Sequence, residues 1–444
     1  MVVERTGVEN TANVERSHDR RFWDAEVQLM PREQLRELQN QRLRGVIRRV
    51  FERPVPFFLD KLRAGGVESP EDIQTVDDLN VVPVTVKSEL RASEADFPPV
   101  GNYRFFDLRD AIRLSESGGT TGTPTLNLWT ARDVEVEHET GARRLWREGL
   151  RPGMIISHSH PAYLYSGGLM VQSLYEFMGV LSLWVPPPLT DEAAEQGIRM
   201  WQRIPLDRPF YGESLRRFAE VAVKMGLDPV LDLNLVNAGM GGRWVAKAEV
   251  GVYPLNTAGS EALAYLGGPC SQSTGAHLAE DYAYVQAVDP TTGKDVAEGE
   301  WGNHVITTFG KDGSLIRYDL EELCRIDTSP CPCGETSVRA WWGGRSADII
   351  PTQGRRIWAF DLDTVLSEID ELRFPSLEFV VVRPQDPGVP LLLRIEYDHL
   401  DQEIIRQRVN VQMMELLHIQ VTVEFVPRGT LPRFAHKRGL IAES

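Results

Sequence analysis

The pattern of apolar and polar positions along the chain indicates an α/β protein. Residues 1–95 are predicted to be mainly helical, and in residues 32–53 apolar side chains recur at helical spacing up to Pro54. Strand-like and helix-like segments alternate between about residues 126 and 188, which favours a mixed or parallel sheet with helices on its faces. From about residue 349 onward, three strand-like runs and one helical run predict a small α/β domain.

Several shorter segments carry their own predictions. Residues 154–161, 163–180 and 181–188 are typical of a strand, a helix and a second strand. Residues 210–226 are predicted to be helical. Residues 288–309, VDPTTGKDVAEGEWGNHVITTF, favour a hairpin with a Thr-Gly turn.

Length and composition narrow the class of protein. A chain of 444 residues exceeds one ordinary core, so two or three domains are expected. The net charge of −16 argues against a nucleic-acid or anionic-membrane partner. The first thirty residues have no apolar core like that of a signal peptide, and no apolar run reaches roughly eighteen residues. We therefore expect a cytoplasmic protein whose four cysteines are thiols or metal ligands.

Residues 115–125, SESGGTTGTPT, combine glycine and hydroxyl side chains more densely than any other part of the chain. Glycines let backbone amides approach a polyanion, and hydroxyls donate further hydrogen bonds, so the stretch suits phosphate. It is not a Walker loop, because the Gly-Lys-Ser/Thr ending is missing. On composition alone, a flexible surface loop is the favoured interpretation of such a stretch.

The segment SGGTTGTPT resembles the SSGTTGKPT phosphate loop of adenylate-forming enzymes, specifically of their phenylacetate–CoA ligase branch. Gly118 stands where that pattern has serine, and Thr123 where lysine is common. The resemblance implies a large N-terminal domain (1–343), a hinge (344–348) and a small, mobile C-terminal α/β domain (349–444). It also implies that the loop grips the phosphates of ATP through Ser117, Gly118, Gly119, Thr120, Thr121, Gly122 and Thr125, with Thr120 among the catalytic residues.

Two further segments resemble the nucleotide site of that family. LNLVNAGMGG stands where the family has a strand ending in Gly-Ala-Glu-Pro, which implies that Gly239, Met240 and Gly241 line the adenine, with Met240 in place of glutamate. LNTAGSEALAYL resembles the "YGxSE" segment, with Thr257 at the tyrosine position and Ser260 and Glu261 matching directly. Glu261 is thereby expected to hold Mg²⁺, a hard cation that prefers oxygen ligands.

The second half of the nucleotide site is implied by three motifs. Residues 288–309 resemble "iDPeTGe.v.dGe.GelViTtL", and SLIRYDLEEL resembles "PliRYrtgDl", with Glu322 at the place of the ribose-binding aspartate. WWGGRSADII resembles the domain junction, where Arg345 matches a ribose and phosphate contact and Ala347 replaces the hinge aspartate. TLPRFAHKRGLI places Lys437 at the catalytic lysine, although Arg433, His436 and Arg438 make a plain basic tail an alternative.

Resemblance also implies an acyl pocket and an entry segment. YLYSGG resembles an aromatic, glycine-containing part of the acyl pocket, so Tyr163, Tyr165 and Gly168 are candidate wall residues, which hints at an aromatic or otherwise flat acid. His160 either faces the substrate carboxylate or caps a strand end. Residues 75–90 resemble the family's "sldDL..lPvt.K..lr" segment, for which we expect packing without chemistry.

Cys270, His277, Cys331 and Cys333 form a donor set for tetrahedral zinc, because three thiolates and an imidazole are ligands that Zn²⁺ prefers. The spacing is not that of a zinc finger, but it resembles "EC....GLH … CxCG" in phenylacetate–CoA ligase relatives. We expect a structural zinc; buried free cysteines are the alternative. Cys324 is expected to lie in the core.

Together these motifs predict an enzyme that converts a carboxylic acid and MgATP to an acyl-adenylate and transfers the acyl group to a thiol, with CoA expected. Transfer to an amine or to a carrier-protein thiol is one alternative. A non-catalytic nucleotide-binding relative is the other, which the replacements at Met240, Thr257, Glu322 and Ala347 favour. A homodimer is kept open, and no nucleic acid or membrane is expected as a partner.

Overall fold

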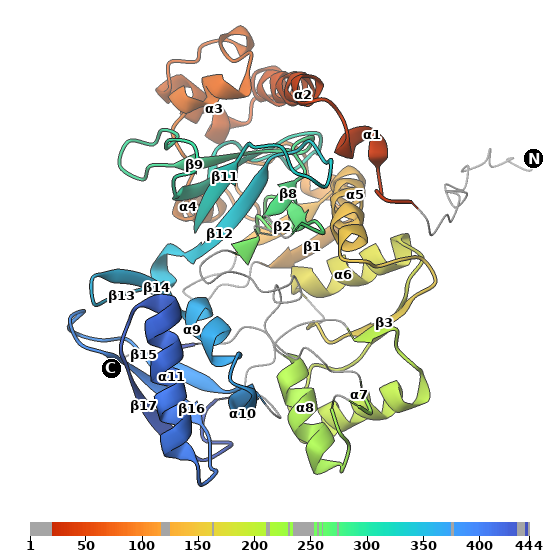
Figure 1. The fold of residues 1–444 in the computed structure, drawn as a ribbon. Coiled ribbons are helices and arrows are strands. Elements are labelled where there is room, and N and C mark those ends of the chain that lie inside the picture. Colours follow the sequence, from red (N-terminus) through yellow and green to blue (C-terminus); the bar gives the residue numbers. More distant parts are fainter. Residues whose placement is uncertain are drawn as a thin grey trace, which may run out of the picture.

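The computed structural model describes residues 20–116, 125–161, 164–209, 214–229, 231–233, 253–254, 257–259, 261–272, 275–373, 377–432 and 440–442. Figure 1 shows the N-terminal helices above a large sheet, a helical region around α6 to α8 at the lower right, and the C-terminal region at the lower left. These regions have separate hydrophobic cores, and the C-terminal core runs from Ile350 to Leu440. Among the described residues, no helix combines the length and the hydropathy that crossing a bilayer requires.

The N-terminal region is helical, as predicted. Helix α1 (Ala25–Gln28) precedes α2 (Arg32–Glu52), which ends before Pro54, and α3 (Pro56–Ala64) follows. Short 3-10 turns then lead to α4 (Lys87–Asp96). Apolar side chains of α2, among them Leu43 and Ile47, are buried in the core that this helix shares with the large sheet, because they lie on one helix face.

The large sheet has seven antiparallel strands in the order β7 (Gly267–Pro269), β8 (Ala276–Leu278), β12 (Arg339–Arg345), β11 (Tyr318–Asp327), β10 (Gly302–Thr308) and β9 (Ala283–Val288), with β6 (Tyr253–Pro254) paired to β12. The predicted hairpin is confirmed, because β9 and β10 are antiparallel neighbours joined through a turn in which Gly293 has φ +68°. Cys324 is buried in this core, as expected.

Residues flanking the glycine-rich stretch form a two-stranded hairpin. Strand β1 (Arg113–Glu116) pairs with β2 (Leu126–Trp129), and the register brings Glu116 opposite Leu126, so the stretch connects the two strands. Helix α5 (Ala131–Arg147) begins directly after β2, with Thr130 as its N-cap. In the capping box at this end, the Thr130 hydroxyl oxygen accepts a hydrogen bond from the Asp133 backbone amide. The Asp133 carboxylate accepts one from the Thr130 backbone amide.

The alternating pattern after α5 forms a small parallel sheet in the order β4-β3-β5. Its elements are β3 (Ile155–His158), α6 (Ser166–Phe177), β4 (Leu181–Trp184), α7 (Asp191–Arg203), β5 (Arg208–Pro209) and α8 (Ser214–Lys224). The predicted sequence of strand, helix and strand, and the predicted helix near residue 220, are both confirmed.

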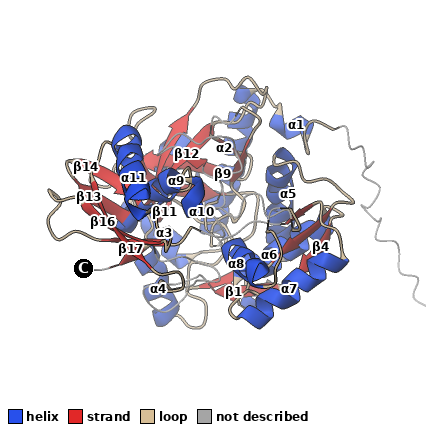
Figure 2. Cartoon of the chain, turned by 60° about the horizontal axis from the view of Figure 1, so that its bottom comes forward, coloured by secondary structure: helices blue, strands red, loops and turns tan. Residues whose placement is uncertain are grey.

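The C-terminal region contains the predicted strands and helix. Its sheet has the order β17-β16-β15-β18, built from β15 (Phe379–Val382), β16 (Leu391–Glu396), β17 (Val421–Val426) and β18 (Ile441–Ala442). Helix α11 (Gln402–Leu417) connects β16 to the parallel β17, and α9 (Ala359–Leu366), α10 (Asp370–Arg373) and the hairpin β13 (Ile349–Thr352) with β14 (Arg355–Trp358) complete it. Figure 2 shows α11 on the left of the molecule and α7 on the right, with α9 and α10 between them.

Aromatic side chains join the large sheet to the C-terminal region. Trp342 on β12 packs edge-to-face on Phe360 of α9, with ring centroids 4.9 Å apart. Gly344 has φ +82°, and a Cβ at this position would collide with the Trp358 indole. Only glycine therefore suits the end of β12, where a short 3-10 turn, Ser346–Asp348, leads into β13.

Candidate active site and metal centre

The Glu261 carboxylate is held by two donors from distant segments. Its Oε1 atom accepts a hydrogen bond from Lys87 Nζ at 3.0 Å and another from the Tyr318 hydroxyl at 3.1 Å. The Oε2 atom faces Gly259, whose backbone has φ +72°. A side chain at this position would bring its Cβ within 3.0 Å of Oε2. One carboxylate oxygen is thus engaged by the protein, while the second faces a glycine backbone that adds no side chain.

A short bridge places Lys87 beside this carboxylate. Thr85 pairs with β11 through the bond from Thr85 N to Arg317 O at 2.7 Å and the bond from Asp319 N to Thr85 O at 2.8 Å. Lys87 follows at the start of α4. The sequence predicts only packing for residues 75–90 and so misses the role of Lys87, although the lysine of the entry motif was the available signal.

Arg317 belongs to the framework under the site. Its guanidinium is 1% exposed and donates to Val82 O at 2.6 Å, Gly293 O at 2.7 Å and Gln286 Oε1 at 3.2 Å. Its backbone has φ +45°, a left-handed conformation that is costly for arginine. These bonds lock the strand that carries Tyr318 to the loops on both sides of it.

The foot of the glycine-rich hairpin lies close to Glu261. A small cavity of about 20 Å³ is lined by Glu261, by Asn127 and Trp129 of β2, and by Lys311, among others. Thr125 is buried at the start of this strand. The fold therefore brings the hairpin and the Glu261 segment together, although they are far apart in the sequence.

Sequence analysis did not predict two buried charged residues near Glu261, namely Glu137 and Lys311. Glu137 on α5 accepts hydrogen bonds from the backbone amides of Ala264 at 3.1 Å and Tyr265 at 3.3 Å, and Lys311 Nζ lies 3.8 Å away. Burial raises the pKa of Glu137, and the Lys311 ammonium opposes that rise. Lys311 also donates to Ala262 O at 2.7 Å, so the pair fixes the chain just after Glu261.

Glu322 and Arg345, predicted as ribose contacts, are direct partners across β11 and β12. The register of β11 is irregular on both sides of Glu322, and Glu321 has φ +59°. Bulges of this kind re-aim a side chain. The Glu322 Oε2 atom lies 4.0 Å from Nδ1 of His304 on β10.

The candidate substrate residues His160, Tyr165 and Gly168 also lie together. The rings of His160 and Tyr165 stack with an interplanar angle of 9°, and burial raises the pKa of Tyr165 to about 12. A Cβ on Gly168 would collide with the Pro161 carbonyl oxygen, so the glycine lets α6 approach the end of β3.

Further aromatic side chains extend this cluster. His158, on β3, lies with its ring centroid 5.1 Å from Trp184 and 5.8 Å from Tyr175. The Trp184 indole donates to His160 O at 2.8 Å. Sequence analysis missed His158 and Trp184, because only the parallel pairing of β3 and β4 places them side by side.

Cys270, His277, Cys331 and Cys333 converge as predicted, with their ligand atoms within 4.8 Å of one another. The Sγ atoms of Cys270 and Cys331 are 3.7 Å apart, and Cys333 Sγ is 3.2 Å from His277 Nε2. Tetrahedral Zn²⁺ with Zn–S near 2.3 Å requires thiolates about 3.8 Å apart, so the donors fit that ion. His277 Nδ1 lies 3.0 Å from Ser337 O, a contact that selects the tautomer in which Nε2 is the ligand atom.

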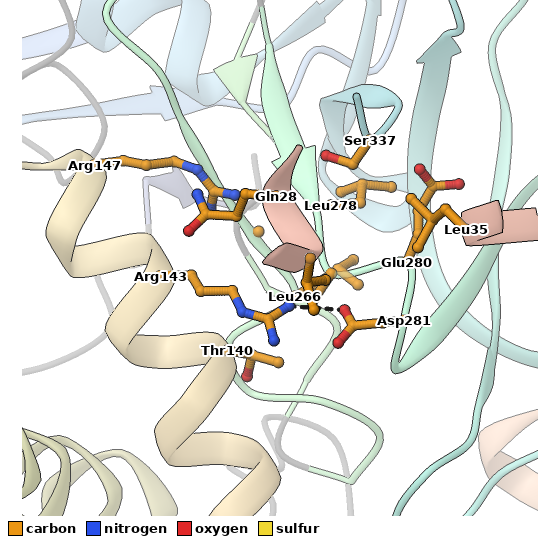
Figure 3. Close-up of a pocket in the computed structure, with 13 residues that line it drawn as sticks. Gln28, Leu35, Thr140, Arg143, Arg147, Leu266, Leu278, Glu280, Asp281 and Ser337 are labelled. Carbon is orange, nitrogen blue, oxygen red and sulfur yellow. Dashed lines mark hydrogen bonds and ion pairs between the residues drawn. The ribbon is translucent and has the colours of Figure 1, made fainter. Parts of the chain in front are cut away.

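Charged side chains surround this centre and tie it to α5. Figure 3 shows two arginines of α5, with Arg147 next to Gln28 and Arg143 paired with Asp281. Arg147 donates three hydrogen bonds, of 2.9, 3.1 and 2.5 Å, to buried Glu335, which also accepts from Gln28 Nε2 at 3.1 Å. The turn carrying Cys331 and Cys333 is therefore docked on the N-terminal segment and on α5, away from Glu261.

Comparison with known proteins gives a consistent result. No family model matches the chain. It is 29% identical to the phenylacetate-coenzyme A ligase of Thermus thermophilus over 93% of this chain and 97% of that one, and 27% identical to the Escherichia coli phenylacetate-coenzyme A ligase over 77% and 78%. Its fold matches a crystal structure of 2-hydroxyisobutyryl-CoA ligase in the postadenylation state, with TM-score 0.83, 21% identity, and coverage of 98% and 95%. The chain is thus similar to phenylacetate-CoA ligases over most of its length.

The phenylacetate-CoA ligase-like fold has a large N-terminal and a smaller C-terminal domain, as expected. Its TM-score drops from 0.83 to 0.67 against the 2-hydroxyisobutyryl-CoA ligase in the thioesterification state.

Several predicted site residues lie outside the described part of this phenylacetate-CoA ligase-like chain. They are Ser117, Gly118, Gly119, Thr120, Thr121, Gly122, Tyr163, Gly239, Met240, Gly241, Ser260 and Lys437. Thr257 is described and exposed. The described candidates form four groups: Glu261 with Lys87 and Tyr318, Glu322 with Arg345, the aromatic cluster around His160, and the cysteine and histidine donors of the metal centre.

Proposed function

We propose that the protein is a ligase that activates a carboxylic acid with ATP and passes the acyl group to CoA. A carboxylate oxygen of the acid attacks the α-phosphorus of ATP, which forms an acyl-adenylate and releases pyrophosphate. The CoA thiolate then attacks the acyl carbonyl carbon, a thioester forms, and AMP leaves. Support comes from the phenylacetate-coenzyme A ligases that the chain resembles and from 2-hydroxyisobutyryl-CoA ligase, whose structures contain acyl-AMP and CoA.

The observation that carries the proposal is the convergence at Glu261. Lys87, Glu261 and Tyr318 belong to separate motifs that resemble the family, and their side chains meet beside the foot of the glycine-rich hairpin. In this proposal residues 117–125 hold the ATP phosphates through backbone amides and hydroxyls. Glu261, through Oε2, is the residue that would hold Mg²⁺, which offsets charge on the triphosphate.

Further residues have proposed positioning roles. Glu322 and Arg345 bind the ribose, which agrees with their direct pairing across β11 and β12. Lys437 stabilises the negative charge that develops as pyrophosphate leaves. Residues 344–348 act as the hinge between domains 1–343 and 349–444, which fits the left-handed Gly344 at the end of β12.

The aromatic cluster supports an aryl or arylacetic-type acid as substrate. His160, Tyr165 and Trp184 present flat rings next to the N-terminus of α6. Such rings favour a flat, apolar group through offset stacking. A long flexible acid would gain less from these rings.

The four cysteine and histidine donors hold a structural Zn²⁺ in this proposal. The donor set is complete, so no position is left open for a substrate, as in other closed zinc sites. We also place the enzyme in the cytoplasm, where free cysteines stay reduced.

The test is pyrophosphate release by the purified protein with ATP, Mg²⁺ and a panel of aryl, arylacetic and aliphatic acids. We expect release that depends on the acid, and thioester formation when CoA is added. Acid-dependent release without CoA thioester, followed by transfer to an added amine or carrier protein, would assign the alternative acceptors. A protein that binds ATP but releases no pyrophosphate with any acid is the non-catalytic relative, and the proposal is then wrong.

Lys437→Ala provides the matched test of mechanism. We expect adenylation to fall by about 100-fold or more, because one charge on the transferring group is lost. Lys294→Ala removes an exposed lysine from the turn between β9 and β10 and should leave the rate unchanged. Equal rates for the two variants would reject the role of Lys437.

A further inference from the structure

His304 is an unusual residue for the interior of the large sheet. It lies on β10 and is fully buried. Neither ring nitrogen has a hydrogen-bond partner among the residues that the structure describes. Since burying an unpaired polar group is unfavourable, native proteins rarely keep one without a function or a partner that arrives later.

The charged group next to this imidazole is Glu322. Its Oε2 atom is 4.0 Å from His304 Nδ1, beyond hydrogen-bond length but within reach of a small side-chain rotation. The backbone creates this proximity. Between the pairs Asn303–Leu323 and Val305–Asp319, β10 has one residue, His304, whereas β11 bulges outward through Glu321 at φ +59°.

The two residues are also neighbouring departures from the sequence patterns that this chain resembles. The pattern "GelViTtL" has an apolar residue at the position of His304, and "RYrtgDl" has aspartate at the position of Glu322. Glutamate is one methylene longer than aspartate. In this chain the longer Glu322 carboxylate can reach His304, the histidine that replaces an apolar residue of the pattern.

Resting on the proposed function, we propose that His304 is a positioning residue for Glu322 in ribose recognition. A carboxylate has two oxygens with about four acceptor sites. When a nucleotide binds, one oxygen of Glu322 accepts hydrogen bonds from the ribose hydroxyls, and the other accepts from Nδ1–H of His304. The imidazole thereby fixes the longer side chain in the orientation that a shorter aspartate would adopt without help.

Nucleotide binding by titration calorimetry tests this role in the full-length protein. We expect His304→Leu to weaken ATP binding about tenfold, the effect of losing one hydrogen bond to a charged group. His304→Gln keeps a donor and should bind ATP within about threefold of the wild type. With 2′,3′-dideoxy-ATP, which lacks the ribose hydroxyls, wild type and His304→Leu should bind equally.

A double-mutant cycle with Glu322→Asp gives the second readout. His304→Leu alone should bind ATP about tenfold more weakly, whereas Glu322→Asp, alone or combined with His304→Leu, should stay within about threefold of the wild type, since aspartate does not need the imidazole. The melting temperature of His304→Leu should not decrease, because leucine replaces a buried imidazole that lacks partners among the described residues.

The outcomes separate this inference from the proposed function. A wild type that does not bind ATP overturns both. Normal ATP binding by His304→Leu, additive weakening in the double variant, or an equal loss of dideoxy-ATP affinity would overturn the role of His304 alone. Pyrophosphate release by the wild type decides the proposed function independently.

Discussion

Arg317 illustrates how the structure changes the interpretation of a motif residue. It belongs to the RY pair that resembles a nucleotide-site motif, yet its guanidinium is buried and bonds only to Val82, Gly293 and Gln286 among the contacts described. We therefore predict that Arg317→Met, which keeps the length of the side chain, lowers the free energy of unfolding but leaves nucleotide affinity intact.

The magnitude follows from the acceptors that lose their donor. Val82 itself is buried, and its carbonyl losing this donor costs about 1–3 kcal/mol. Gln286 keeps its amide bonds to Asn80 and Asp295, so its oxygen contributes only about 1 kcal/mol. Gly293 lies in a partly exposed turn, where water can replace the guanidinium. The sum is about 3 kcal/mol, or a melting temperature lower by roughly 5 °C.

The assay compares thermal unfolding with the KM for ATP in Arg317→Met and in Arg53→Met, an exposed control at the end of α2. We expect a lower melting temperature for Arg317→Met alone and similar KM values for both. An unchanged melting temperature together with a KM raised tenfold or more would show that Arg317 contacts the nucleotide, and the reasoning from burial would be refuted.

Three further predictions concern the metal, the backbone and pH. Purified protein should carry about one zinc per chain, and Cys331→Ser should lose it and unfold at lower temperature; metal analysis that finds none, with the thiols reduced, removes the site. Glu321→Gly should raise the free energy of unfolding by about 1 kcal/mol in chemical denaturation, since φ +59° is unfavourable for glutamate; a decrease would contradict this. Burial lowers the pKa of His138 to about 4 in the folded chain, below its unfolded value near 6.5. The unfolded state therefore binds more protons, and stability is lost as pH falls from 6.5 towards 4. His138→Gln should show less of this loss in melting curves, and an identical pH dependence would contradict it.

The sequence alone determined the local elements and the types of donor. Apolar periodicity located α2 and α11, and the Thr-Gly turn predicted the β9–β10 hairpin. The alternation after α5 predicted strands β3 and β4 in a mixed or parallel sheet, and the structure shows the pairing to be parallel. These features depend on neighbouring residues, so they can be predicted without knowledge of the rest of the chain. The chemistry of three thiols and an imidazole likewise indicated their convergence, which the structure confirms.

Only the tertiary structure decided which distant side chains meet. Lys87 contacts Glu261 because Thr85 pairs with β11, and His304 faces Glu322 because of a bulge that no local pattern announces. Arg317 occupies a motif position, but its burial between two loops makes it a framework residue. Register, bulges and burial arise from the packing of strands that are far apart in the sequence. This packing decides whether a charged motif residue faces the site or lies buried in the framework.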